Sequence, residues 1–179
     1  MCAMRAHACA SVQTHPAPTA YVRGQSLTPE IVLYKNILVA TDGSALSLKA
    51  VAHAMALAQA LGAKLTAFHA SAEYPMPAYD GATFYEAIPP GDYAKLCKKE
   101  SDRILGAIAR KAASSRVEFA AVQAIASTPW EAILAAARKQ KCDVIVMASH
   151  GRRGVSALLL GSETQKVLTY SKLPVLVLR

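Results

Sequence analysis

Apolar residues along this chain fall into short uninterrupted runs that are separated by longer stretches with helical periodicity. The runs at 37–40 and 144–148 contain no polar residue, which is typical of strands buried on both faces of a parallel sheet. Including these two, the pattern predicts five strands, at 37–40, 65–70, 117–124, 144–148 and 174–178.

The first stretch between strands, 45–61, has the spacing of an amphipathic helix. Its predicted inward face consists of Val51, Ala54, Ala58 and Leu61. Ser44 is placed to cap the N-terminus, and Gly62 to end the helix in a left-handed conformation.

Three further helices are predicted from start signals and apolar spacing. The second covers 92–113, with Asp92 as its cap and Leu96, Ile104 and Ile108 facing inward. The third runs to about residue 139, and its capping box is formed by Thr128 and Glu131 around Pro129. The fourth begins with a capping box from Ser162 to Gln165.

Alternation of strands and helices predicts a parallel sheet with right-handed crossovers and helices on both faces. No internal repeat is found, so residues 34–179 form one domain. Residues 1–33 show neither the apolar period of a helix nor that of a strand. We expect this segment to be a disordered or loosely attached extension, or a segment added by the choice of start codon. The segment 71–91, rich in Pro, Tyr and Gly, is predicted to be a long loop that is functional, lid-like or disordered.

Composition narrows the classes of function. The formal charge is +8 over 179 residues, but the basic residues are scattered and lack interleaved aromatic residues. This pattern favours solvated helix faces over a nucleic-acid surface. No apolar run of membrane-spanning length and no secretory signal is present, and the four cysteines have no CxxC or zinc-like spacing. A reduced, cytoplasmic protein without a metal cluster is expected.

Candidate chemistry lies in two loops that follow strands. One is 40–44, after the first strand, and the other is 148–162, after the fourth. Ligands of open parallel sheets bind beyond the carboxyl ends of the strands. Gly161 and Ser162 open a helix, whose free N–H groups and dipole favour a phosphate group. An ordinary capped loop is the alternative interpretation.

Several enzyme classes lack their motifs in this sequence. We find no Walker A motif, no GxGxxG signature and no nucleophile elbow. A fast NTPase or a dehydrogenase is therefore disfavoured. Asp42 or Glu163 could orient a water molecule, which would support slow ATP hydrolysis at most.

The segments YKNILVATDGS and CDVIVMASHGRRGVSALLLGSETQKVLTYSKLPVLVLR resemble the universal stress protein family, and the resemblance covers residues 34–179. It implies a single doubly wound, five-stranded parallel sheet of order 3-2-1-4-5, Rossmann-like and similar to adenine nucleotide alpha hydrolases. The family's nucleotide-binding motif, Gly-x2-Gly-x9-Gly-Ser/Thr, reads Ala148-x2-Gly151-x9-Gly161-Ser162 here. Alanine in place of the first glycine fits if its φ is negative and is crowded if it is positive.

The resemblance also implies which residues would contact a nucleotide. The base would lie against Ala40, Thr41, Asp42 and Ala70. The ribose would lie along Met147, Ala148 and His150. The phosphates would be surrounded by Gly151, Gly161, Ser162, Glu163 and Thr164, with Mg²⁺ bridging their oxygens.

Structural roles remain open for several of these residues and their neighbours. Asp42 could cap the first helix, and His150 could brace its own loop. His69 fits a satisfied core histidine, and Trp130 fits helix packing.

Taken together, the sequence predicts a stress-response regulatory protein that binds ATP. By resemblance it would be a homodimer that pairs the edge strand 174–178 antiparallel across a twofold axis, and it would act on a protein partner that the sequence does not identify. The alternatives are an interaction protein of the same fold that binds no nucleotide, which Ala148 favours, and a slow ATPase.

Overall fold

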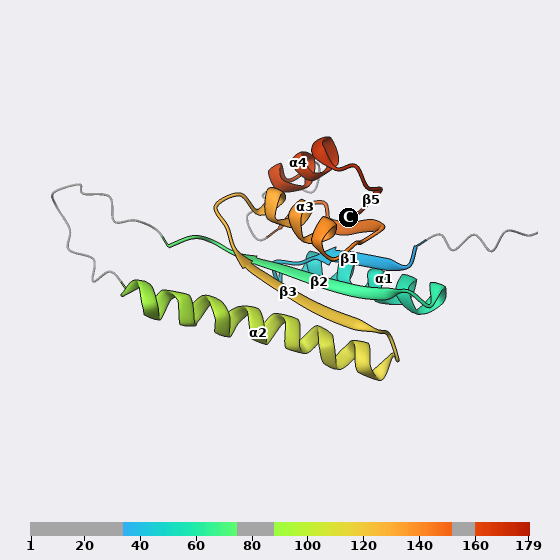
Figure 1. The fold of residues 1–179 in the computed structure, drawn as a ribbon, viewed down its shortest axis with the longest axis horizontal. Helices are drawn as coiled ribbons and strands as arrows, with labels where there is room; N and C mark the ends of the chain where they lie inside the picture. Colours follow the sequence, from blue (N-terminus) through green and yellow to red (C-terminus); the bar gives the residue numbers. More distant parts are fainter. Residues whose placement is uncertain (1–33, 75–87, 152–159) are drawn as a thin grey trace, which may run out of the picture. The chain divides into compact units, whose positions relative to one another are not determined.

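The computed structural model describes residues 34–74, 88–151 and 160–179. The expected N-terminal extension, the tip of the expected lid and most of the spacer between Gly151 and Gly161 lie outside these ranges. In chain order the elements are β1 (Asn36–Ala40), α1 (Ala45–Leu61), β2 (Lys64–Ser71), α2 (Pro90–Ser114), β3 (Phe119–Ile125), α3 (Pro129–Lys139), β4 (Val144–Ala148), α4 (Ser162–Tyr170) and β5 (Val175–Leu178) (Figure 1).

The five strands form one parallel sheet in the order β3-β2-β1-β4-β5. This confirms the predicted strand order and places β3 and β5 at the two edges. The order of the strands reverses at β1, because β2 and β3 lie on one side of it and β4 and β5 on the other. β1 and β4 are neighbours in the sheet although more than half of the chain lies between them in sequence. A crevice is expected beyond the carboxyl ends of these strands.

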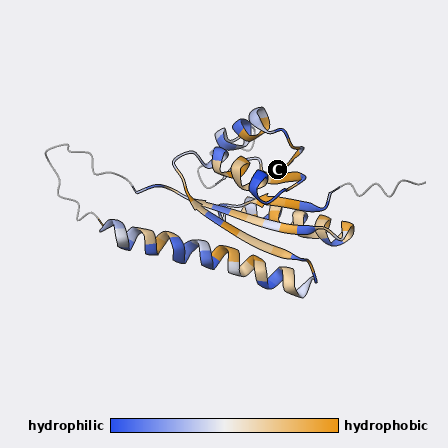
Figure 2. Cartoon of the chain, in the orientation of Figure 1, coloured by the Kyte–Doolittle hydropathy of each residue, from blue (hydrophilic) through white to orange (hydrophobic). Residues whose placement is uncertain are grey.

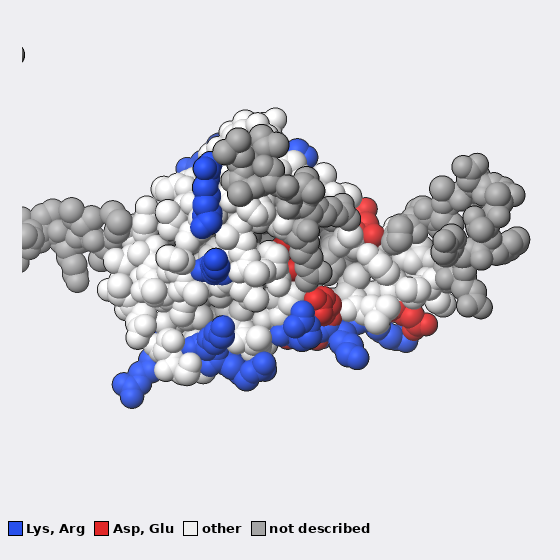
Figure 3. All heavy atoms as spheres, turned by 180° about the vertical axis from the view of Figure 1, so that it is seen from behind, with Lys and Arg blue, Asp and Glu red and all other residues white. Residues whose placement is uncertain are grey.

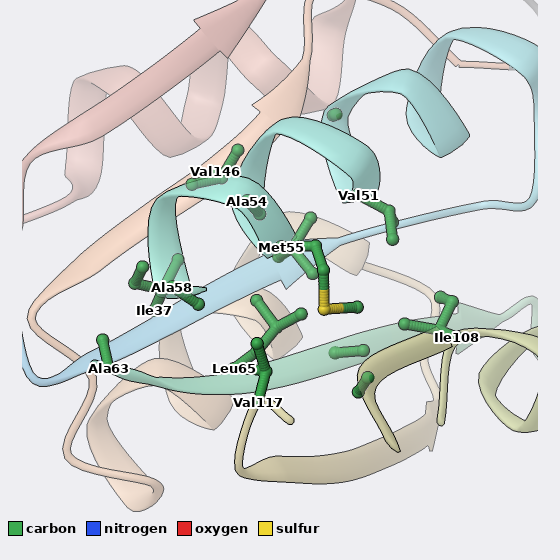
Figure 4. Close-up of a cluster of buried hydrophobic side chains, with 14 of the residues drawn as sticks. Ile37, Val51, Ala54, Met55, Ala58, Ala63, Leu65, Ile108, Val117 and Val146 are labelled. Carbon is green, nitrogen blue, oxygen red and sulfur yellow. The ribbon is translucent and has the colours of Figure 1, made fainter. Parts of the chain in front are cut away.

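Two apolar layers hold the helices against the sheet. On one face, α1 and α2 cover side chains such as Ile37, Leu65 and Val146, and Figure 4 shows Met55 and Ile108 closing over them. On the other face, α3 and α4 cover Leu38 and Phe68. The strands are accordingly apolar along most of their length, while the helices alternate apolar and polar positions (Figure 2). The central strands β1 and β4 are therefore buried on both faces, as their uninterrupted apolar runs predicted, whereas the edge strands β3 and β5 are partly exposed.

The capping of α1 follows the sequence prediction. Ser44 accepts a hydrogen bond from the Ser47 N–H at 3.2 Å, and Gly62 ends the helix with φ of 62°. Val51, Ala54 and Ala58 are buried, but Leu61 is 37% exposed. Leu61 lies in the final turn, where the chain leaves the helix, and its predicted inward position is wrong.

The start of α2 also differs from the prediction. The helix begins at Pro90, and Pro89 occupies the cap position without a side-chain cap, so Asp92 lies within the first turn instead of capping it. Leu96 is 51% exposed, against the prediction. The buried residues of α2 begin only at Ser101, because the first turns of the helix extend past the strands (Figure 1).

Neither predicted capping box forms. The Thr128 hydroxyl donates to Glu131 Oε2 at 3.0 Å and makes no cap hydrogen bond to the backbone. Ser162 is the first residue of α4, and Gly161 occupies the cap position. At the start of α3 a distant acceptor replaces the box, because the Trp130 N–H donates to Glu163 Oε2. At the start of α4, within the described residues, only the Gly161 N–H is bonded, to the Ser149 carbonyl.

Charged side chains are distributed as the scattered pattern indicated. Figure 3 shows Lys and Arg spread over one face and along its lower edge, with Asp and Glu among them. On α2 they form local pairs such as Lys95 with Asp92 and Arg103 with Glu100. Of the helices in the described ranges, none is both long and apolar enough to cross a lipid bilayer.

Candidate functional site

A cavity of about 560 Å³ opens at the carboxyl ends of the strands. All twelve residues that the sequence nominated line it: Ala40, Thr41, Asp42, Ala70, Met147, Ala148, His150, Gly151, Gly161, Ser162, Glu163 and Thr164. The structure adds eight residues that the sequence reasoning missed: Ser47, Phe68, Ala72, Glu73, Ala126, Ser127, Pro129 and Ile133. The two loops predicted to carry chemistry therefore meet at one site.

The loop after β1 is braced by its own side chains. Thr41 Oγ1 lies 2.9 Å from Ser47 Oγ, and it accepts a bond from the Gly43 N–H at 3.1 Å. Asp42 Oδ1 accepts a bond from the Ser44 N–H at 3.0 Å. Gly43 has φ of 77°, a conformation that favours glycine. Asp42 shapes the turn before α1, while Ser44 is the cap itself.

Strand β2 projects past β1 into the cavity. The β1–β2 register ends at Ala40 and Phe68, and the Thr41 N–H then donates to the Phe68 carbonyl at 2.9 Å. Peptide groups of alternate residues in a strand point to opposite neighbours. Because the Ser71 carbonyl bonds to β3 through the Ala126 N–H, the N–H and C=O of Ala70 point to the β1 side, where β1 has ended. They face the cavity as one donor and one acceptor.

Glycine is needed at two motif positions because of space. A Cβ on Gly151 would lie 2.6 Å from Asp42 Oδ2. A Cβ on Gly161 would lie 3.2 Å from both the His150 Cα and the Ser149 carbonyl oxygen. The glycines therefore allow the two loops to pack closely against each other.

The N-terminus of α4 forms one wall of the cavity. The first intrahelical bond runs from the Gln165 N–H to the Gly161 carbonyl at 2.9 Å, so the N–H groups of Ser162, Glu163 and Thr164 have no acceptor within the helix. The Gly161 N–H, which we expected to face an anion, donates instead to the Ser149 carbonyl at 2.7 Å. The amides of this turn that could bind an anion are therefore those of Ser162, Glu163 and Thr164, and not that of Gly161.

Ala148 fits its position in the motif without strain. Among the described residues other than glycine, only Arg116 and Lys141 have positive φ, so the backbone at Ala148 is one that alanine adopts freely. Its carbonyl accepts a hydrogen bond from the buried Thr164 hydroxyl at 2.9 Å. Alanine therefore fits here, because its φ is not positive.

The two candidate histidines separate clearly. His150 Nδ1 lies 3.1 Å from Ser149 Oγ, so it braces its loop while lining the cavity. His69 is 5% exposed, and its Nδ1 lies 2.9 Å from Ser101 Oγ on α2. His69 is therefore a buried histidine with a hydrogen-bond partner, and it lies on the face of the sheet that α2 covers.

The Glu163 side chain reaches another helix. Its Oε2 accepts a hydrogen bond from the Trp130 N–H of α3 at 2.9 Å, and its Oε1 lies 3.6 Å from Lys166 Nζ. Trp130 packs its ring on Tyr170 of α4, as expected for a packing residue. The N-termini of α1, α3 and α4 thus all converge on the cavity, and the positive ends of their dipoles favour an anion there.

The described residues include no group of three or more His, Cys, Asp or Glu side chains that could hold a metal ion. A metal at this site would therefore need ligand atoms from the bound molecule. Four of the lining residues that the sequence did not indicate also lie beyond the carboxyl ends of strands, where ligands of parallel sheets bind. Ala126, Ser127 and Pro129 follow β3, and Glu73 follows β2. Phe68 and Ile133 carried only the signal of core residues.

The model of the universal stress protein family matches residues 33–179. A universal stress protein of Thermus aquaticus is 37% identical over 147 residues, which are 82% of this chain and 100% of that protein. One of Methanocaldococcus jannaschii is 31% identical over 82% of this chain and 83% of its own length.

Solved structures show the same fold. A family protein from Burkholderia pseudomallei superposes with a TM-score of 0.63 at 23% identity, over 82% of this chain and 96% of its own. A universal stress protein solved in complex with cAMP has a TM-score of 0.58 at 26% identity, over 82% of this chain and 97% of its own.

Proposed function

This chain belongs to the universal stress protein family, and on that premise we propose that it is a cytoplasmic, stress-response regulatory protein whose cavity binds an adenine nucleotide, with ATP as the ligand. The observation that carries this proposal is the pairing of two features in one cavity. The first-turn residues of α4, whose amides lie outside the helix ladder, line the cavity, and so does Ala70, which lies beyond the end of the β1–β2 pairing.

The Ala70 edge suits a nucleobase. One backbone N–H and one C=O, side by side, match the N1 acceptor and the N6 donor of adenine. Apolar side chains that could hold the ring surround this end of the cavity, among them Phe68 and Ile133. Small polar groups fixed in an apolar pocket are the usual means of orienting a ligand.

The α4 end suits the phosphates. The amides of Ser162, Glu163 and Thr164 lie at a helix N-terminus, where backbone donors and the helix dipole both favour an anion. The Ser162 hydroxyl can add a bond. Mg²⁺ fits here as a partner of the phosphate oxygens, because it keeps several waters and needs few protein ligands.

The first experiment is mass spectrometry of small molecules released from the purified, denatured protein, followed by calorimetric titration with ATP, AMP, cAMP and GTP, each with and without Mg²⁺. We expect adenine nucleotides to bind and GTP to bind more weakly. A folded, ligand-free protein that shows no binding heat with any adenine nucleotide would overturn the proposal and favour a pure interaction protein.

The site itself is tested by Gly161→Val. The added side chain would be forced into the backbone at Ser149 and His150 and would move the first turn of α4. Nucleotide binding should be lost while the far-UV circular dichroism spectrum is retained. Gly91→Ala is the matched control, because a Cβ there meets nothing within 4 Å. Unchanged affinity in Gly161→Val would place the ligand elsewhere.

We also propose that the protein is a homodimer that pairs its β5 strands. β5 lies at a sheet edge, and Leu176 is 45% exposed on it. An open edge invites another strand. Light scattering should give the mass of a dimer at micromolar concentration, and Leu176→Glu should give a monomer. Ile125→Glu, on the opposite edge and 52% exposed, should leave the dimer intact. A monomeric native protein would contradict this assembly.

A further inference from the structure

Within the described residues, three hydrogen bonds hold the first turn of α4, two to the end of β4 and the residue after it and one to α3. The Gly161 N–H donates to the Ser149 carbonyl in the loop after β4, at 2.7 Å. The Thr164 hydroxyl donates to the Ala148 carbonyl at the end of β4, at 2.9 Å. The Glu163 carboxylate accepts from the Trp130 N–H at the start of α3, at 2.9 Å. Only the bond of Glu163 joins the turn to another helix.

The start of α3 lacks a side-chain cap of its own. Thr128, in the cap position, makes no cap hydrogen bond, and its hydroxyl is used by Glu131. Pro129 has no N–H, so Trp130 carries the first backbone donor of the helix. Glu163, which follows 33 residues later in the sequence, satisfies this donor with a charged acceptor. Acidic groups at a helix N-terminus are favourable because of the dipole.

We propose that Glu163 is a positioning residue for the bound nucleotide: its carboxylate holds the N-terminus of α3 against that of α4 and thereby sets the width of the cavity between them. Pro129 and Ile133 of α3 form one wall, and the amides of α4 form the other. The Glu163 side chain acts through α3 and does not need to touch the ligand. The ligand-binding part of this inference rests on the proposed function.

The same helix pair carries a spectroscopic reporter. The Trp130 ring stacks on Tyr170, with centroids 4.8 Å apart and planes at 30°. Tyr170 is the last residue of α4, so Glu163 and Tyr170 hold Trp130 from the two ends of one helix. The chain contains a single tryptophan. Its fluorescence, excited at the red edge where tyrosine does not absorb, and its own band in the near-UV circular dichroism spectrum therefore report on the surroundings of this one ring.

The first test uses the ligand-free protein and does not depend on nucleotide binding. Glu163→Ala removes the acceptor, and the Trp130 near-UV band and emission maximum should shift. Glu163→Gln keeps an acceptor oxygen and should restore most of the native signal. Glu131→Ala, which removes a carboxylate from the same end of α3 but outside the cavity lining, should leave the spectrum unchanged. A native spectrum in Glu163→Ala would overturn the link between the helices.

The second test measures affinity for ATP with Mg²⁺ by calorimetry in the same variants. Loss of a charge-assisted hydrogen bond in a positioning role should weaken binding about tenfold in Glu163→Ala and no more than about threefold in Glu163→Gln. Native affinity in Glu163→Ala, with a shifted Trp130 spectrum, would overturn the positioning role while the proposed function stands. If the native protein binds no nucleotide, the proposed function fails, and with it the positioning role. The spectra would then still decide the link between the helices.

Discussion

Gly151 and Asp42 meet across the gap between two loops, and the absence of a side chain on Gly151 is what leaves room for the Asp42 carboxylate. A Cβ at Gly151 would lie 2.6 Å from Oδ2 of Asp42, far inside van der Waals contact. The two residues follow β1 and β4, which are adjacent in the sheet. Close contact between them sets how the two sides of the cavity face each other.

Gly151→Val is therefore expected to displace Asp42 and to weaken nucleotide binding at least tenfold with the fold retained. Overpacking of this kind typically costs about 1–3 kcal/mol. The measurement is calorimetric affinity for ATP with Mg²⁺, together with thermal unfolding. If steric displacement is the cause, the double variant Gly151→Val with Asp42→Ala should show less than the sum of the two single effects, because the shorter side chain at position 42 vacates the contested space. Additive effects would rule out this explanation.

Two glycines outside the site should respond in opposite directions to alanine. Gly106 lies inside α2, and a Cβ there would meet only the Arg110 guanidinium at 3.8 Å, so Gly106→Ala should stabilise the protein by about 0.5–1 kcal/mol. Gly62 has φ of 62°, and Gly62→Ala should destabilise it by about 1 kcal/mol. Urea unfolding of both variants measures the difference. A stabilising effect at Gly62 would contradict its capping role.

Ser44 and Thr128 were both predicted to cap a helix, but their replacement by alanine should lower the free energy of unfolding by different amounts. Ser44 accepts a bond from the Ser47 N–H, so Ser44→Ala should cost about 1 kcal/mol of unfolding free energy. Thr128 makes no cap bond to the backbone, so Thr128→Ala should cost less than about 0.5 kcal/mol. Equal losses in urea unfolding would show that Thr128 also caps its helix in solution.

The two described cysteines should react at different rates. Burial raises the pKa of the Cys142 thiol, although a hydrogen bond with Thr66 offsets part of the effect. Cys142 is 6% exposed, whereas Cys97 is half-buried on α2. Alkylation at pH 8 in a Cys2→Ser, Cys9→Ser background should modify Cys97 first and Cys142 only on unfolding, because less thiolate forms and access is closed. Peptide mass spectrometry identifies the modified residue.

The raised pKa of Cys142 also makes the stability of the fold depend on pH. The folded state holds this proton to higher pH than the unfolded state does, so the contribution of Cys142 to stability is lost as pH rises above the ordinary thiol range of about 8.5. Cys142→Ala should flatten the decline in melting temperature in this range. A decline as steep as that of the native protein would assign it to other groups.

Local patterns predicted the elements well where the physical cause is local. The uninterrupted run at 37–40 indicated a doubly buried strand, and Ser44 with Gly62 gave the ends of α1. The start of α2 was missed because Asp92 resembles a cap, whereas the helix already begins at Pro90. Leu96 was misplaced because spacing alone does not show where the sheet ends beneath a helix.

The candidate residues were found from motif spacing and family resemblance, but the states of their polar groups were not. The Gly161 amide is bonded to Ser149, and the Glu163 carboxylate to Trp130. Neither bond has a sequence signature, because the partners are brought together only by the packing of loops and helices.

The sequence by itself determined the alternation of strands and helices and the loops that follow β1 and β4, because periodicity and turn chemistry act between near neighbours in the chain. The site residues within those loops were indicated by motif spacing and family resemblance, and eight further lining residues were not indicated at all. Only the tertiary structure decided which amides of α4 remain outside the helix ladder, which glycine accommodates Asp42, and which carboxylate caps α3. Those outcomes depend on contacts between residues far apart in sequence, whose distances are set only when the sheet has assembled.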